Sequence, residues 1–246
     1  GAAVYVSAPS TTDATEDKNG SGKLDVTVAA VTVDKDGKIV ACALDTASST
    51  VNFTADGKAV AAGEFKTKYE LGTDYNMVAY GGATKEWFEQ ANAFDAACVG
   101  KTTAEIAGLE AADGKGNADL QAAGCTITVK SYLDALQEAW DNGVEVEGVA
   151  KVGLGQNISV KGTAATADKN GTVQVDTNMV GVALDAEGKI LWGKIDVAQQ
   201  KIAFDATGAK AGDVDVRTKV EKEGDYGMVG ASGIGKEYFE QIEALE

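Results

Sequence analysis

The residues best suited to chemistry form one short turn, Gly124-Cys125-Thr126-Ile127-Thr128, which leads directly into an amphipathic segment. A glycine lets the backbone approach a phosphate closely, backbone N–H groups at the start of a helix favour an anion, and a threonine hydroxyl can accept a transferred group. The turn is therefore suited to hold a phosphorylated ligand, either non-covalently or as an ester of Thr128. The alternative is a plain junction, in which a strand at Cys125–Lys130 enters a helix capped by Ser131.

Other chemistry-bearing residues are few. The chain has no histidine, which removes the usual general base and the commonest transition-metal ligand, so histidine triads and zinc-dependent hydrolysis are excluded. Cys42, Cys98 and Cys125 have neither zinc-site spacing nor the even number of a full disulfide framework, and at most one pair could form. Their small apolar neighbours favour buried, inert thiols. The calcium-like loop at Asp17–Gly22 has Val28 where the metal requires Glu, so we expect no metal site and no catalytic residue.

Composition and charge limit the class of protein. Of the 246 residues, 44% are hydrophobic, which favours a folded chain with a sizeable core. The net charge of −16 would repel phosphate backbones, and no basic stripe overcomes it, so we expect no nucleic-acid partner. No apolar run approaches the roughly 20 residues of a membrane-spanning helix. Residues 1–22, rich in Ala, Ser, Thr and Asp, are expected to form a tether of the kind common in exported surface proteins.

The sequence contains an internal duplication with an offset of 151 residues, which holds without insertion from Asp17 onward. This period is far longer than the ~20 to 50 residues of solenoid repeats. We therefore expect a first unit at 23–146 and a second, truncated unit at 147–246. The second unit has no counterpart of residues 96–142, so the Thr128 turn is present once. The clearest matched segments are DKNG at Asp17–Gly20 and Asp168–Gly171, DYNMV at Asp74–Val78 and DYGMV at Asp225–Val229, and KEWFEQ at Lys85–Gln90 and KEYFEQ at Lys236–Gln241.

The elements expected within a unit mix strands and helices. Val, Thr and Ala residues on either side of a DKDG turn predict a β-hairpin, and the copy repeats this pattern around DAEG. Hydroxyl residues followed by apolar residues at helical spacing predict helix starts. The expected strands are Lys23–Val33, Lys38–Leu44, Val51–Phe53, Tyr75–Tyr80, Thr172–Leu184, Lys189–Val197 and Ile202–Phe204, and the expected helix caps are Thr84, Thr102 and Ser131.

The turn resembles that of the FMN-binding domain family, found in the Rnf and Na⁺-pumping quinone-reductase subunits and in surface flavoproteins of Gram-positive bacteria. In that family a Ser/Thr-Gly-Ala-Ser/Thr-x-Thr turn precedes a helix, and its last threonine can carry FMN through a phosphoester bond. On this chain Gly124 matches the glycine, Thr126 the second hydroxyl residue and Thr128 the flavinylated position. Cys125 replaces the alanine and Ala123 the first Ser/Thr.

The hairpins extend the resemblance, since the family's D-x-x-G-K-I turn is matched at Asp34–Ile39 and at Asp185–Ile190. The resemblance implies an α+β fold of two related units, each an antiparallel sheet with helices packed on one side. It also implies FMN held at Gly124, Cys125, Thr126 and Thr128, either non-covalently or esterified at Thr128. The implied protein is an extracellular bacterial lipoprotein, anchored to the cell surface, that passes electrons to a membrane or surface redox partner.

Two other classes of function remain open. A noncatalytic cell-surface or cell-wall module would keep the fold without the flavin, and the altered residues around Thr128 motivate it. A small-ligand or glycan binder would use the aromatic residues that both copies share, although core packing explains these residues best. The shared aromatic residues are Tyr75, Trp87 and Phe88 with Tyr226, Tyr238 and Phe239.

Overall fold

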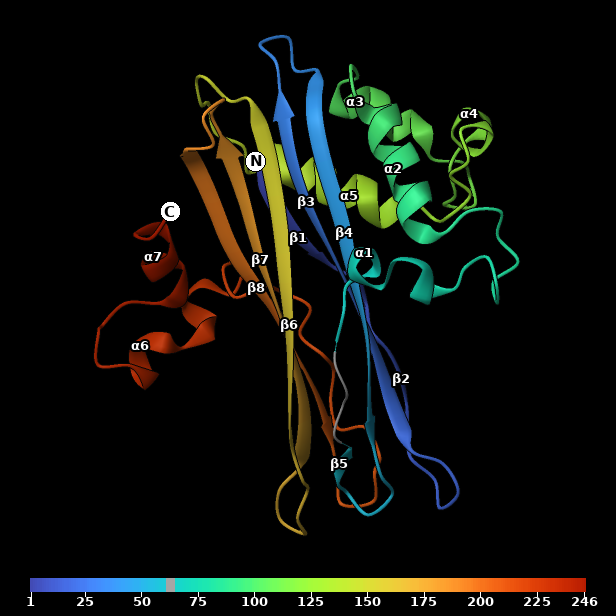
Figure 1. Ribbon diagram of the computed structural model, residues 1–246. Helices are drawn as coiled ribbons and strands as arrows, with labels where there is room; N and C mark the ends of the chain where they lie inside the picture. Colours follow the sequence, from blue (N-terminus) through green and yellow to red (C-terminus); the bar gives the residue numbers. More distant parts are fainter. Residues whose placement is uncertain (61–64) are drawn as a thin grey trace.

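The computed structural model describes residues 1–60 and 65–246 and shows two antiparallel β-sheets packed face to face, with helices outside them (Figure 1). The first sheet has the order β1-β3-β4-β5, with β2 also paired to β3, and the second has the order β6-β7-β8. The predicted α+β class is confirmed. The strands are β1 (Ala2–Val6), β2 (Ser10–Thr12), β3 (Gly20–Val33), β4 (Ile39–Phe53), β5 (Ala59–Val60), β6 (Lys151–Thr163), β7 (Gly171–Leu184) and β8 (Ile190–Phe204).

The two long hairpins lie where the sequence predicts them. β7 and β8 begin and end 151 residues after β3 and β4, and the expected strands at Val51–Phe53 and Ile202–Phe204 are the ends of β4 and β8. Each hairpin turn is held by an aspartate. Asp34 Oδ1 accepts hydrogen bonds from the N–H groups of Asp36 and Lys38, both at 2.9 Å, and Asp185 does the same in the second hairpin. These local contacts explain why the turns were readable from sequence.

The expected tether at residues 1–22 is wrong, because this segment supplies β1 and β2 to the first sheet. β1 pairs antiparallel with β3, from Ala2 opposite Ala30 to Val6 opposite Val26. Ala2 is fully buried, and its neighbours in β1 are also in the core. The pairing with β3 provides hydrogen-bond partners for the backbone N–H and C=O groups of this short apolar segment. A solvent-exposed tether would not need such partners.

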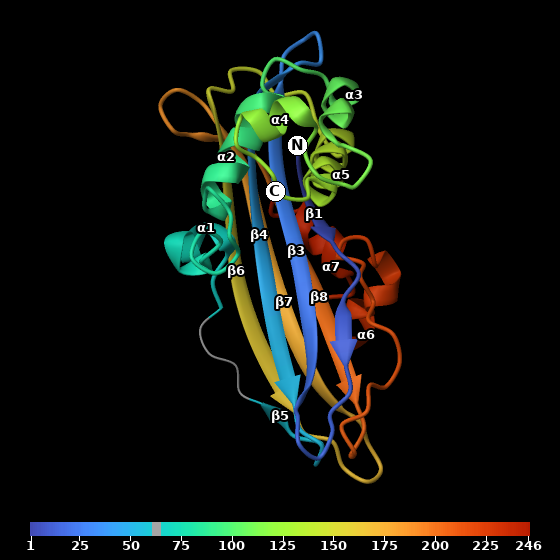
Figure 2. The same ribbon diagram turned by 90° about the vertical axis from the view of Figure 1, so that its right-hand side faces the viewer.

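The inner faces of the two sheets form a shared core (Figure 2). Val28 of β3 packs in one cluster with Met179 of β7, and Phe53 of β4 packs in a second cluster with Phe204 of β8. Two backbone hydrogen bonds join the halves reciprocally: the N–H of Ala14 donates to the carbonyl of Gly208 at 2.9 Å, and that of Ala165 donates to Gly57 at 2.7 Å. Ala165 and Gly208 lie 151 residues after Ala14 and Gly57, so equivalent positions make equivalent contacts across the interface.

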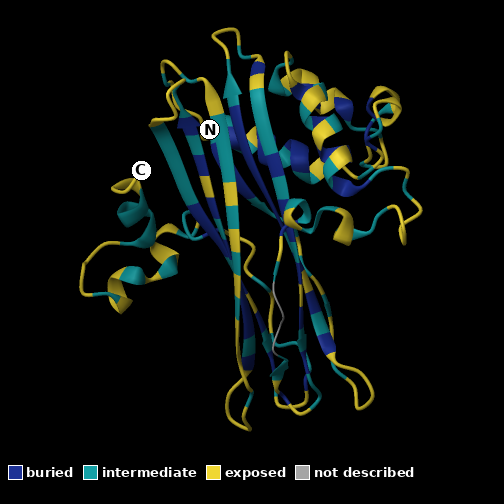
Figure 3. Cartoon of the chain, viewed as in Figure 1, coloured by how far each residue is buried: buried dark blue, intermediate teal, exposed yellow. Residues whose placement is uncertain are grey.

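Helices cover the outer face of the first sheet (Figures 1 and 2). α2 (Trp87–Cys98) packs on β4, and α5 (Lys130–Asp141) packs across β1 and β3. Both helices bury apolar residues at helical spacing against the sheet. Figure 3 shows buried and exposed residues alternating along α2. The shorter helices are α1 (Lys68–Leu71), η1 (Gly72–Tyr75), α3 (Thr103–Ile106), η2 (Ala107–Leu109), α4 (Ala118–Ala122), η3 (Glu223–Tyr226), α6 (Met228–Ala231) and α7 (Tyr238–Glu243).

Two helix starts differ from the expected caps. α2 begins after Glu86 rather than Thr84, because Glu86 forms a capping box with Glu89. α5 begins after Val129 rather than Ser131, which lies inside its first turn. Thr102 caps α3 as predicted. Within residues 1–60 and 65–246, no helix is both long and apolar enough to cross a membrane.

Two expected strands are wrong. Tyr75–Tyr80 forms the end of η1 and a run of turns, since Asn76 adopts the left-handed region with φ of 61° and prevents an extended path. Cys125–Lys130 forms no strand either. Only Thr128 in this stretch makes a β-bridge, to Lys115, and Lys130 already begins α5.

Candidate ligand cavity beside Thr128

A cavity of about 380 Å³ lies beside Thr128, between the outer face of the first sheet and the start of α5. It brings together lysines, hydroxyl groups and aromatic rings from three separate stretches of the chain. The N-terminal strands and loop contribute Ser7, Lys23, Asp25, Thr27 and Thr46, the segment from α1 to α2 contributes Lys68, Tyr75, Met77 and Trp87, and the start of α5 contributes Ile127, Thr128, Ser131 and Tyr132.

The turn that carries Thr128 is shaped first by its glycine. Gly124 follows α4 with φ of 96°, a conformation that favours glycine, and a Cβ there would overlap the side chain of Lys85. Lys85 Nζ donates a hydrogen bond to the carbonyl of Ala123 at 3.2 Å. Cys125 is fully buried in the core under the helices. Gly124 and Cys125 therefore shape and anchor the turn, and they do not line the cavity.

Gln90 of α2 holds the middle of the turn. Its Oε1 accepts hydrogen bonds from the backbone N–H of Thr126 at 2.8 Å and from the Thr126 hydroxyl at 3.0 Å, and its Nε2 donates to the carbonyl of Lys85 at 3.0 Å. Gln90 is 1% exposed. Gln90 is not among the residues predicted from the sequence. A single polar residue on the buried face of a helix indicates that its side chain has a hydrogen-bond partner in the core. Because Gln90 engages the Thr126 hydroxyl, Thr126 has a structural role here.

Of the four residues predicted to hold FMN, Thr128 is the one that lines the cavity. It is exposed, and its bridge to Lys115 fixes the backbone on the far side of the turn. Ser131, in the first turn of α5, lines the same space. The N–H of Tyr132 already donates to the carbonyl of Val129 at 3.0 Å, and the start of this 12-residue helix is its positive end, which favours an anion. The hydroxyl groups of Thr128 and Ser131 therefore line the cavity beside the start of α5.

Aromatic rings line the cavity as well. Trp87 Nε1 donates a hydrogen bond to the Tyr132 hydroxyl at 2.8 Å, and the two rings meet edge to face. Burial raises the pKa of Tyr132, which therefore stays neutral. The Lys68 ammonium lies 5.2 Å from the centre of the Tyr75 ring and 5.5 Å from that of Trp87. Such cation–aromatic contacts hold Lys68 over the rings and keep a positive charge in the cavity.

The same lysine arrangement occurs in the second half of the chain. Lys219 lies 5.3 Å from the centre of the Tyr226 ring and 5.1 Å from that of Tyr238. Supporting contacts recur as well: Glu86 accepts the N–H groups of Met77 and Val78, and the equivalent Glu237 accepts those of Met228 and Val229. The lysine–aromatic arrangement is therefore common to both units.

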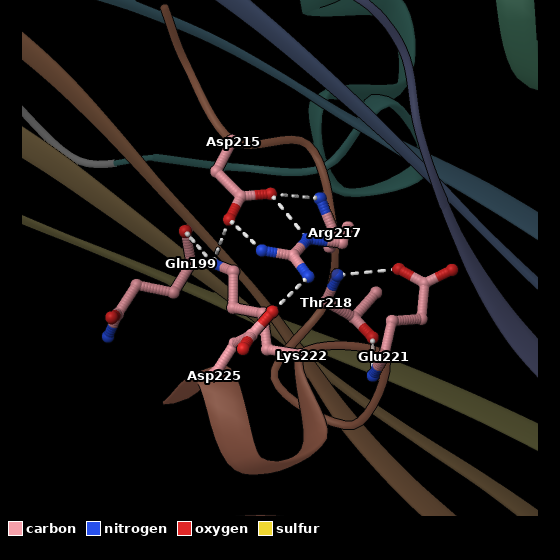
Figure 4. Close-up of polar contacts among 7 residues, drawn as sticks. All are labelled: Gln199, Asp215, Arg217, Thr218, Glu221, Lys222 and Asp225. Carbon is pink, nitrogen blue, oxygen red and sulfur yellow. Dashed lines mark hydrogen bonds and ion pairs between the residues drawn. The ribbon is translucent and has the colours of Figure 1, made fainter. Parts of the chain in front are cut away.

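A second group of charges lies on the second half, around the only arginine of the chain (Figure 4). Arg217 donates to both carboxylate oxygens of Asp215, at 3.2 and 3.1 Å, and to Asp225 Oδ2 at 2.8 Å. Lys222 lies 3.7 Å from the same Asp215 carboxylate and donates to the carbonyl of Gln199 at 3.5 Å. The two aspartates raise the pKa of Arg217 and balance its charge. This network fastens a surface loop to β8, and its cations are already paired.

Comparison with known protein families, with curated proteins and with solved structures finds no match for this chain. In the part of the chain that the structure describes, no cluster of three or more His, Cys, Asp or Glu residues could hold a metal ion. The function must therefore be inferred from the cavity itself.

Proposed function

We propose that the cavity beside Thr128 binds FMN and that the protein serves as an electron carrier. The observation that carries this proposal is the meeting of Thr128, a helix start, two lysines and aromatic rings around one space of about 380 Å³. FMN joins a planar aromatic ring system to a negatively charged phosphate. Its binding site therefore needs a cationic region for the phosphate beside an apolar wall for the rings. When bound, FMN would supply the redox chemistry, and the protein would bind and orient it.

Residues of two walls would hold the group. Thr128, Ser131 and the first turn of α5 would bind the phosphate, with Lys68 supplying charge. Tyr75 and Ile127, both partly buried on the cavity wall, would contact the ring system. Lys68 now covers the faces of Tyr75 and Trp87, so it would have to shift toward the phosphate as the ring system enters. Thr128 is also the residue at which the FMN phosphate would be esterified.

We also propose that the protein works outside the cell, anchored at the bacterial surface as a lipoprotein and facing a membrane or surface redox partner. The resemblance of the turn and hairpins to surface flavoproteins supports this setting. The net charge of −16 supports a partner with a basic docking surface.

The direct test is titration of the purified chain with FMN and with riboflavin, which lacks the phosphate, followed by flavin fluorescence and calorimetry. We expect FMN to bind at least about tenfold more tightly, because a charge-assisted contact to phosphate contributes about 1.5–3 kcal/mol and 1.4 kcal/mol is tenfold. Lys68→Met should weaken FMN binding by a similar factor. Lys219→Met removes the equivalent lysine of the other unit and is the matched control, which should bind FMN normally.

The covalent form has its own readout. After coexpression with a flavin transferase, the intact mass should rise by one FMN, and Thr128→Ala should abolish the increase while leaving non-covalent binding measurable. Absence of FMN affinity together with absence of added mass would overturn the flavin proposal.

The second candidate is a noncatalytic cell-surface module. The repeated lysine–aromatic arrangement favours it, because a feature present in both units does not depend on the flavin turn. It predicts a folded protein with no flavin affinity in either unit. A glycan-stacking role for Trp87 is disfavoured, since that side chain is 1% exposed and offers no open ring face.

A further inference from the structure

Cys42 and Cys98 lie at one contact between a strand and a helix. Cys42 is partly buried on β4, and its Sγ lies 3.6 Å from the carbonyl oxygen of Asp95 in α2. Cys98 follows Asp95 by three residues, so the two share a helix face, and a helical side chain leans toward the preceding turn. Cys98 is fully buried and belongs to the same apolar cluster against which Cys42 packs. The fold thus brings together two thiols that are 56 residues apart in sequence.

The surroundings keep the Cys42 sulfur as a thiol in the reduced protein. Interaction with the Cys98 thiol and burial raise the pKa of Cys42. Burial also raises the pKa of Asp95 to about 7, so the neighbouring carboxyl adds little negative charge at acidic pH. Cys42 is not an activated nucleophile, because its pKa is raised, and a metal site is absent from the described residues. The two cysteines lie at one strand–helix contact, and Cys42 is the member that a small reagent can reach.

We propose that Cys42 and Cys98 form an intramolecular disulfide when the protein meets a small oxidising disulfide, fastening α2 to β4. The Cys42 thiolate attacks one sulfur of the reagent, forms a mixed disulfide and releases one reagent thiolate. The Cys98 thiolate then attacks the Cys42 sulfur and releases the second. The two protons lost by the protein are taken up by the two reagent thiolates, so the dithiol is oxidised by two electrons and the reagent disulfide is reduced to two thiols.

The third cysteine supplies the competing pair. Cys125 is fully buried, and burial raises its pKa to about 11, with a smaller contribution from the charge of Cys98. Cys98 therefore has two thiol neighbours. Cys42 is favoured over Cys125 because its partial exposure lets the reagent attach there first, whereas Cys125 is fully buried.

The disulfide would have a measurable structural effect. It would close a loop between β4 and the end of α2, the helix that carries Trp87, which lines the cavity, and Gln90, which holds the Thr126 turn. A loop of this length predicts that oxidation raises Tm by roughly 5 °C or more. The linkage is independent of what the Thr128 cavity binds, so it can hold or fail separately from the flavin proposal.

The test is incubation of the folded, reduced chain with cystamine at about pH 9, near the ordinary pKa of a thiol, followed by acid quenching, intact mass and peptide mapping. Wild-type protein should lose the mass of two hydrogen atoms and yield a Cys42–Cys98 linked peptide. Cys98→Ala should instead retain one half of the reagent on Cys42 and show no rise in Tm. Cys125→Ala is the matched control and should form the bond like wild type.

Three outcomes would overturn the proposal. One is a Cys98–Cys125 linked peptide in place of the expected one. Another is a stable mixed disulfide on Cys42 in wild-type protein, which would show that Cys98 cannot reach it. The third is a wild-type chain that stays fully reduced while the urea-unfolded chain reacts.

Discussion

The phenyl rings of Phe53 and Phe204 stack face to face between the two sheets, with centroids 4.7 Å apart and ring planes 3° apart. Phe53 ends β4, Phe204 ends β8, and both side chains are fully buried. Their positions differ by the 151-residue offset of the duplication, so each half supplies the same residue to one contact. Gly20 and Gly171, directly opposite them in the neighbouring strands, leave room for the rings. The stack therefore joins the halves at equivalent positions.

Replacing either ring should weaken the packing of the two sheets against each other. Phe53→Leu and Phe204→Leu are each expected to lower the free energy of unfolding, and the double variant should lose less than the sum. A stacked aromatic pair contributes about 0.5–1.5 kcal/mol beyond its buried area, which sets the expected coupling energy. Urea unfolding of wild type, the two single variants and the double variant measures this coupling energy. Phe94→Leu, in the separate core under the helices, is the control and should show no coupling to Phe204→Leu. A Phe53–Phe204 coupling of zero would contradict the role given to the stack.

The glycines under the rings are a second test of the same region. A Cβ on Gly171 would lie 2.6 Å from both Phe204 Cε2 and the backbone nitrogen of Ala165. Because the backbone cannot move away easily, Gly171→Ala should lower the free energy of unfolding by about 1–3 kcal/mol. Gly155→Ala, in strand β6 with no atom within 4 Å of the new Cβ, is the matched control and should stay within about 0.5 kcal/mol of wild type. Equal effects of the two substitutions in thermal and urea unfolding would contradict this packing.

Local signals made the hairpins and one helix cap predictable. The DKDG and DAEG turns form hydrogen bonds within four residues, and Thr102 and Glu105 complete a capping box within three. The strands within residues 1–22 could not be predicted from composition, because they form only by pairing with β3. Packing of the two sheets against each other is likewise a long-range property that the duplication did not reveal.

The candidate site was predictable only in part for the same reason. The sequence predicts a helix soon after Thr128, and α5 begins two residues later, at Lys130. Lys68 and Gln90 come from segments distant in sequence, and only the packing of α1 and α2 beside α5 brings them to the turn. Their residue types are common on helices, so no local pattern could distinguish them.

Gln90 provides a test of how the turn is held. Gln90→Met keeps the length of the side chain but removes the acceptor for the N–H and hydroxyl of Thr126. A buried donor left without its partner costs about 1–3 kcal/mol, so we expect a loss of that size in unfolding free energy and faster hydrogen exchange at the Thr126 amide. Gln241→Met, at the equivalent position of α7, where the side chain bonds only to the carbonyl of Lys236, should cause a smaller loss. Unchanged exchange at Thr126 would show that Gln90 does not hold the turn.

The Asp95 carboxyl predicts a pH dependence of stability. Burial raises its pKa in the folded protein from 3.8 to about 7, so between these values the folded chain keeps a proton that the unfolded chain releases. Its contribution to stability is thus fully present below the unfolded pKa of 3.8 and is lost as the pH rises toward and through 7. Asp95→Asn cannot ionise and should escape this loss. Relative to wild type, the variant should therefore gain stability from about pH 4 to about pH 8, by about 1–3 kcal/mol, since each unit of pKa shift corresponds to about 1.4 kcal/mol and solvent screens part of it.

Urea unfolding of wild type and Asp95→Asn at several pH values measures this gain as a difference, in which the titration of other carboxyls cancels. Glu138, whose pKa burial also raises to about 7, should show the same sign in Glu138→Gln, and the two substitutions should act additively, because the residues lie on different helices. Asp74→Asn, at an exposed position, is the control for the loss of one surface carboxyl. A constant difference between Asp95→Asn and wild type from pH 4 to 8 would mean that Asp95 is ionised in the folded state throughout, with a carboxylate beside Cys42 that solvent stabilises.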